Sequence, residues 1–139
     1  MANLVVEVKK TDDKVHFEGV SDTDRSIAIP FDFAPPLGTG QGFAGLEILL
    51  MSFAGCVSTT IVFVLARSAK HVTSYSASAE GVRSEHPLLL KTIHFHIRLE
   101  SEDITENDME NAIKQAEALS PVWQAVKNNV SIETTFVLL

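Results

Sequence analysis

Apolar and polar positions alternate over residues 4–8 and again over residues 15–17, with the polar residues 11–13 between them. A period of two is typical of a half-buried strand, and the polar interruption is typical of a turn. The sequence therefore predicts a half-buried hairpin, followed by a third short strand over residues 26–29 that Pro30 terminates. Residues 31–45 contain two prolines, four glycines and three phenylalanines, which predicts a loop that packs over another part of the protein.

The central part of the chain, residues 48–66, contains no charged side chain. A run of this length approaches the ~20 residues of a membrane-spanning helix. However, hydroxyl side chains interrupt the run, no second such segment accompanies it, and the flanking segments need a core element to pack against. We therefore predict a helix that ends near Lys70, lies at the centre of a soluble fold and does not enter a membrane.

The second half of the chain alternates again over residues 74–83 and 88–99, with a turn at residues 84–87. Residues 105–108 have the form of a capping box with Thr105 as N-cap, and apolar residues follow at helical spacing up to Leu119. Ser120 and Pro121 predict the start of a short second helix, and residues 130–139 predict a closing strand. This order of hairpins and helices indicates an α+β fold.

Length, charge and cysteine content narrow the class of protein. A chain of 139 residues predicts one domain, residues 1–139, with a substantial core. The net charge of -7 and the absence of a basic stripe argue against a nucleic-acid partner. The chain has one cysteine and no pattern of a secretory signal, so we expect a cytoplasmic protein without disulfides.

Cys56 is the only cysteine, and it lies within the uncharged run. A free cysteine is usually a small buried hydrophobic residue, and burial alone leaves it inert. Ser52, Thr59 and Thr60 share its helix face, where their hydroxyls either stabilise a thiolate or bond back to helix carbonyls. Gly55 in a helix interior indicates that a partner element or a ligand approaches closely.

Other candidate residues carry weaker signals. Glu47 stands near the helix start, about 13.5 Å of helical rise from Cys56, so it is not a direct base for the thiol. A favourable charge at the helix N-terminus explains it, and orienting an arginine at a pocket edge is the alternative. His94 and His96 share one strand face, but no third or fourth ligand accompanies them, so we expect no metal and no cofactor.

Three segments together resemble the OsmC/Ohr family, and most closely its OsmC-like branch. Residues 45–56 open on Gly-Leu-Glu and reach Ala-Gly-Cys, as in the family's central helix. Residues 80–96 are similar to the strand pair of that branch, including its histidines. Residues 116–123 resemble the second helical segment, where the family typically has Cys-Pro and this chain has Ser120-Pro121.

The resemblance implies an intertwined homodimer with antiparallel sheets around a long buried central helix. It also implies reduction of organic hydroperoxides at the dimer interface by a cysteine pair. Cys56 falls at the position of the attacking thiol, and Ser120 falls at that of the resolving cysteine, where no disulfide can form. Glu47 matches the acid of the OsmC-like branch. Arg25 is the nearest arginine by region to the one that the peroxidases use.

Two functions follow as hypotheses. The first is a thiol-dependent hydroperoxide reductase, or one-cysteine derivative, in oxidative stress defence. Its catalytic residues would be Cys56, Glu47 and Arg25, and an external thiol would reduce it. The alternative is a catalytically inactive dimer that binds a small apolar ligand at its interface pocket. The Ser120 substitution and the phenylalanine-rich loop favour this second function.

Overall fold

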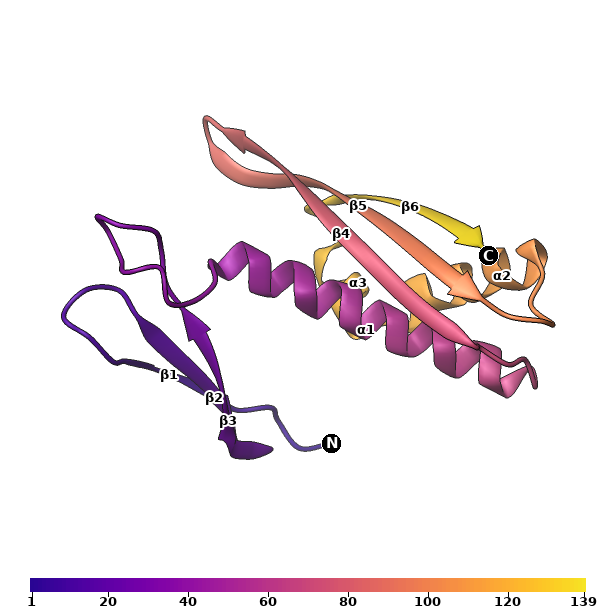
Figure 1. Ribbon diagram of the computed structural model, residues 1–139, viewed down its shortest axis with the longest axis horizontal. Helices are drawn as coiled ribbons and strands as arrows, with labels where there is room; N and C mark the ends of the chain where they lie inside the picture. Colours follow the sequence, from indigo (N-terminus) through magenta and orange to yellow (C-terminus); the bar gives the residue numbers. More distant parts are fainter. The chain divides into compact units, whose positions relative to one another are not determined.

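The computed structural model describes residues 1–139 and divides them into two compact units, which we call unit 1 (Met1–Ile48) and unit 2 (Leu49–Leu139). Figure 1 shows two sheets of three strands and a long helix that begins at the end of unit 1 and continues through unit 2. The α+β class predicted from the sequence is confirmed.

Unit 1 contains one antiparallel sheet in the order β1 (Val6–Lys10), β2 (Phe17–Ser21) and β3 (Asp24–Phe31). The predicted hairpin is present, but every residue of β1 is exposed, so the expected half-burial is wrong for this strand. Pro30 does not terminate β3, because it lies inside the strand opposite Glu18. A proline is tolerated there since β3 is an edge strand.

Unit 2 contains the second sheet and three helices. The long helix α1 (Gly45–Arg67) is followed by β4 (Ser74–Glu85), β5 (Leu88–Glu100), α2 (Glu106–Leu119), α3 (Pro121–Val126) and β6 (Ser131–Leu138). β4 and β5 are antiparallel, as predicted. β6 lies parallel to β5, which corrects the expectation of purely antiparallel sheets. The crossover through α2 and α3 allows this pairing, because parallel neighbours need a long connection.

The hydrophobic core lies entirely within unit 2. One face of α1 packs against the inward residues of β5, with the Phe53 and Phe95 rings edge to face at 5.5 Å. The buried residues of the two elements are Phe53, Val57, Ile61, Val64 and Leu65 on α1 and Ile93, Phe95, Ile97 and Leu99 on β5. By length and composition α1 resembles a membrane span, but this buried face makes it a core helix.

The helix ends follow local rules. α1 ends at Arg67 rather than near Lys70, because Ala69 adopts a left-handed conformation with φ of 57°. The Lys70 N–H then donates to the Leu65 carbonyl at 3.0 Å, which is a Schellman closure.

The predicted capping box of α2 is confirmed, with Asp108 N donating to Thr105 Oγ1 at 3.2 Å. Leu119, predicted on the apolar face of α2, is exposed.

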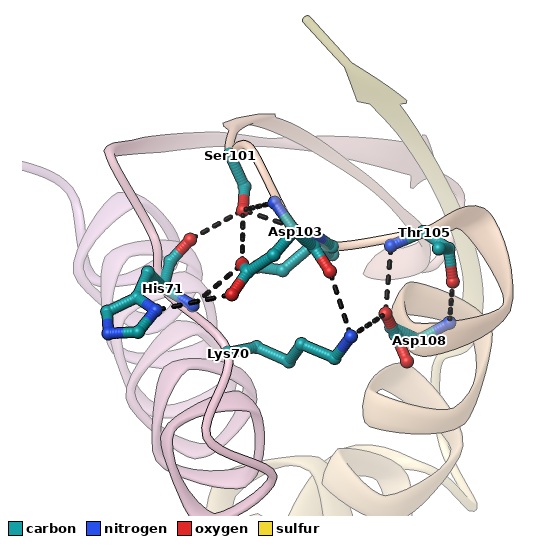
Figure 2. A network of polar contacts seen from close by, with 7 residues as sticks. Lys70, His71, Ser101, Asp103, Thr105 and Asp108 are labelled. Atoms are coloured by element: carbon teal, nitrogen blue, oxygen red, sulfur yellow. Dashed lines mark hydrogen bonds and ion pairs between the residues drawn. The ribbon is translucent and has the colours of Figure 1, made fainter.

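A polar network joins the segment after α1 to the segment before α2 (Figure 2). The carboxylate of Asp103 accepts hydrogen bonds from the backbone N–H and ring of His71 and from the hydroxyl of Ser101. Lys70 Nζ donates to the Asp103 carbonyl at 2.9 Å and lies 3.4 Å from the Asp108 carboxylate. The hydrogen bonds from His71 lower the pKa of Asp103 to about 2.

Candidate functional site

Cys56 and Ser120 are in direct contact, although 64 positions separate them in the chain. The Ser120 hydroxyl donates to Cys56 Sγ at 3.2 Å. Ser120 is fully buried, whereas Cys56 is only partly buried. The structure therefore brings together the attacking and resolving positions that the family resemblance assigned to these two residues.

The position of Ser120 is fixed by two helices that meet at this residue. Its backbone N–H donates to the Ala116 carbonyl at 2.8 Å and closes α2, while its hydroxyl oxygen accepts the Trp123 N–H at 3.4 Å and caps α3. The predicted N-cap is thus confirmed, with Pro121 at the first helical position. Trp123 also packs against Phe53 of α1, with ring centroids 5.6 Å apart. This contact lies one helical turn before Cys56 and fixes α1 against α3.

The hydroxyls of Thr59 and Thr60, on the face of Cys56, donate to helix carbonyls and not to the thiol. Thr59 Oγ1 donates to the Gly55 carbonyl at 2.8 Å, and Thr60 Oγ1 donates to the Cys56 carbonyl at 3.0 Å. Of the two roles left open for these threonines, bonding back to the helix is the one observed. A Cβ added at Gly55 would have no neighbour within 4 Å, so no element of this chain makes the close approach that we expected.

Glu47 and Arg25 are occupied by local partners within unit 1. Glu47 Oε1 accepts the Ala44 N–H at 2.9 Å, which is one half of a capping box at the start of α1. Arg25 pairs with Glu7 at 3.0 Å and with Asp22. Glu47 therefore serves the helix N-terminus and does not pair with Arg25. A catalytic role for Glu47 or Arg25 stays a prediction.

His94 and His96 both contact β6 through Nδ1. His94 lies 2.8 Å from the Glu133 carboxylate, and His96 lies 2.7 Å from the Thr135 hydroxyl. These pairs follow from the parallel register that places each histidine opposite its partner. No group of three or more potential metal ligands occurs in the structure.

Unit 1 contains an apolar hollow of about 440 Å³. We call it the aromatic hollow; its lining residues are Val8, Val15, Phe17, Phe31, Asp32, Phe33, Phe43 and Gly45. The sequence predicted that the phenylalanine-rich loop packs over another part of the protein. Within unit 1, however, Phe33 and Phe43 remain 51% and 43% exposed. An open, aromatic surface of this size suits a small apolar molecule.

Asp32, one of the residues that line the aromatic hollow, is a buried carboxylate that the sequence interpretation missed. It accepts the N–H groups of Phe33, Thr39 and Gln41 and the hydroxyl of Thr39, at 2.8–3.4 Å. Burial alone would raise the pKa of Asp32, but these hydrogen bonds outweigh it and lower the pKa. The available signal was a single acid followed by the Gly-Thr-Gly-Gln-Gly segment, whose N–H groups can surround an anion.

Comparison with models of protein families shows which family the chain belongs to. The family model described as OsmC-like protein matches residues 38–135, which include both Cys56 and Ser120. The chain belongs to the OsmC-like protein family. The resemblance found in the sequence is therefore confirmed. No curated protein sequence matches significantly.

Solved structures extend the likeness of this OsmC-like protein to the whole chain. An OsmC-like protein from Mycoplasma pneumoniae aligns with a TM-score of 0.85 at 19% identity, covering 99% of this chain and 98% of the other. An organic hydroperoxide resistance protein from Legionella pneumophila aligns with a TM-score of 0.76 at 15% identity, covering 98% and 97%. One from Bacillus subtilis aligns with a TM-score of 0.68 at 13% identity, covering 98% of each chain. At these identities the comparisons establish the OsmC fold.

Proposed function

We propose that this OsmC-like protein is a thiol-dependent hydroperoxide reductase that works with one cysteine in oxidative stress defence in the cytoplasm. The observation that carries the proposal is the contact of the thiol of Cys56, a partly buried residue, with the hydroxyl of the fully buried Ser120. Membership of the family and the likeness to organic hydroperoxide resistance proteins support the same chemistry.

The reaction begins when the Cys56 thiolate attacks one oxygen of an organic hydroperoxide. The O–O bond breaks, the departing alkoxide takes up a proton to leave as an alcohol, and Cys56 becomes a sulfenic acid. Ser120 cannot form a disulfide, so an external low-molecular-weight thiol must attack the sulfenic acid and release water. A second molecule of that thiol then releases Cys56 and departs as a disulfide.

A homodimer is part of this proposal. The face of α1 that unit 2 leaves open carries Met51, Val62 and Phe63, which are 52%, 37% and 54% exposed. It contains no charged side chain between Ile48 and Ala66, and Gly55 lies open on it. Apolar faces of this kind are typical of interfaces between copies. We expect Val62→Glu to shift the protein to monomers in sedimentation, whereas Lys114→Glu on α2 leaves the dimer intact.

The test of the enzymatic step is consumption of cumene hydroperoxide in the presence of a series of low-molecular-weight thiols. We expect catalytic turnover with at least one thiol and none with Cys56→Ser. A wild-type protein that consumes no hydroperoxide with any thiol, while remaining folded, contradicts the proposal. Ser58→Ala is a control, because Ser58 lies on the same helix and bonds to Tyr75 rather than to the thiol.

The aromatic hollow favours a second candidate function, the binding of a small apolar ligand without catalysis. Its lining is almost entirely apolar, and its one buried acid is fully engaged by the loop. Native mass spectrometry of the freshly purified protein would then detect a retained ligand. Binding that persists in Cys56→Ser and is lost in Phe43→Asp favours this candidate, and binding lost in Cys56→Ser contradicts it.

A further inference from the structure

We propose that Ser120 is a hydrogen-bond donor that sets the reactivity of Cys56, rather than a residue left behind by the loss of a cysteine. The inference deepens the proposed function and rests on it for the use of the thiol. It concerns how the one-cysteine site prepares its sulfur for attack on a hydroperoxide. The contact itself is independent of any substrate.

The Ser120 hydroxyl is the donor of this hydrogen bond, and when Cys56 is ionised the sulfur has no proton and can only accept. The Ser120 hydroxyl oxygen already accepts the Trp123 N–H, so the hydroxyl proton remains free to donate, and Cys56 Sγ lies 3.2 Å away. The resulting chain runs from a backbone N–H through a hydroxyl to sulfur. A donor that is itself hydrogen-bonded is polarised and donates more strongly. The bond strengthens further when the sulfur is ionised.

Ser120 is also the donor that the structure assigns to this sulfur. The hydroxyls of Thr59 and Thr60, which share the helix face, are used by helix carbonyls. Ser120 is fully buried and held at both helix ends, so its hydroxyl loses little freedom when it donates to the thiolate. A preorganised donor in a buried position stabilises charge more effectively than one in water.

The experiment measures the rate of alkylation of Cys56 by iodoacetamide as a function of pH. Because the chain has one cysteine, the rate reports Cys56 alone. Hydrogen bonds to charged groups are the strong ones, so we expect Ser120→Ala to slow alkylation about tenfold at neutral pH and to move the midpoint of the profile upward. We expect Ser120→Thr, which keeps the hydroxyl, to react within about twofold of wild type.

Two further variants separate donation from capping. Thr105→Ala removes the N-cap hydroxyl of α2 without touching the thiol, so we expect it to lower stability and leave the alkylation midpoint unchanged. If Ser120→Ala fails to fold, Ser120→Gly removes the hydroxyl while retaining most of the capping preference. An unchanged midpoint in folded Ser120→Ala or Ser120→Gly overturns the inference, because both variants lack the donor.

The failure of the inference is distinguishable from the failure of the proposed function. A shifted midpoint in Ser120→Ala together with no peroxide turnover in wild type supports the donor and contradicts the reductase. Turnover with an unchanged midpoint supports the reductase and contradicts the donor. Ser120→Cys tests the geometry separately: we expect a peroxide-induced disulfide with Cys56, and a failure to form one contradicts the placement of the two side chains.

Discussion

Each of the two units buries one polar side chain, and the two residues behave differently. Asp32 in unit 1 uses its carboxylate entirely within its own loop, where it accepts three backbone N–H groups and a hydroxyl. Ser120 in unit 2 accepts one backbone N–H and retains a proton for Cys56. A buried polar group whose hydrogen bonds are all made within its own loop stabilises the conformation of that loop. A buried hydroxyl that donates to a thiol can also change the reactivity of the thiol.

The units also differ in their cores. Every residue of the hydrophobic core belongs to unit 2, whereas β1 and β3 of unit 1 expose Val6, Val8, Ile27 and Ile29. A small sheet gains little stability from its own strands when its apolar residues stay in water. In the homodimer that we propose, the second copy would supply the contacts that these residues lack. We therefore expect the stability of unit 1 to depend on the protein concentration more than that of unit 2.

The largest effect is expected for Gly38→Ala, which breaks the loop around Asp32. The added Cβ would lie 2.1 Å from Asp32 Oδ1 and 2.2 Å from the Phe33 carbonyl oxygen, so the loop must rearrange. We expect a loss of about 3 kcal/mol, since overpacking a rigid backbone is among the costly substitutions. Hydrogen exchange at the Thr39 and Gln41 amides should accelerate, because these amides donate to Asp32.

Gly45→Ala is the matched control for that substitution. A Cβ at Gly45 has no neighbour within 4 Å, and Gly45 lies at the start of α1. We expect no loss of stability from it. Faster exchange throughout β5 in Gly38→Ala would contradict the account, because the core of unit 2 does not depend on the loop.

An intermediate effect, which depends on pH, is expected at Asp103 of unit 2. Hydrogen bonds from His71 lower its pKa from 3.8 to about 2, so the folded state favours the ionised carboxylate. The resulting stabilisation is fully present above pH 3.8 and is lost as the pH falls toward 2. The free energy of unfolding of wild type should exceed that of Asp103→Asn near neutral pH, and acid titration should reduce the difference. A difference that is constant over this range contradicts the assignment.

The smallest effect is expected for Ala69→Gly, which improves the end of α1. Ala69 has φ of 57°, a conformation that glycine adopts without strain. We expect a gain of about 0.5–1 kcal/mol in the free energy of unfolding, measured by urea titration. A loss of stability would mean that the left-handed residue is not the source of strain at this helix end.

Local signals in the sequence predicted much of the fold. The uncharged run predicted α1, and the capping box at Thr105 predicted the start of α2, because both depend on neighbouring residues only. The parallel pairing of β6 with β5 was missed, since nothing local specifies which strand it joins. Asp32 was missed for a related reason, because its partners extend to residue 41 and depend on the loop conformation. The contact of Cys56 with Ser120 came from the family resemblance, as no periodicity connects positions so far apart.

The most direct test of the account is peptide mass mapping after treatment with one equivalent of cumene hydroperoxide. The account predicts one oxygen atom added at Cys56, no disulfide, and reversal by a low-molecular-weight thiol. Met1, which is fully exposed and lies outside the proposed dimer face, serves as an internal reference for unspecific oxidation. Oxidation of Met1 with Cys56 unmodified would contradict the claim that Cys56 carries the reactive atom of this protein.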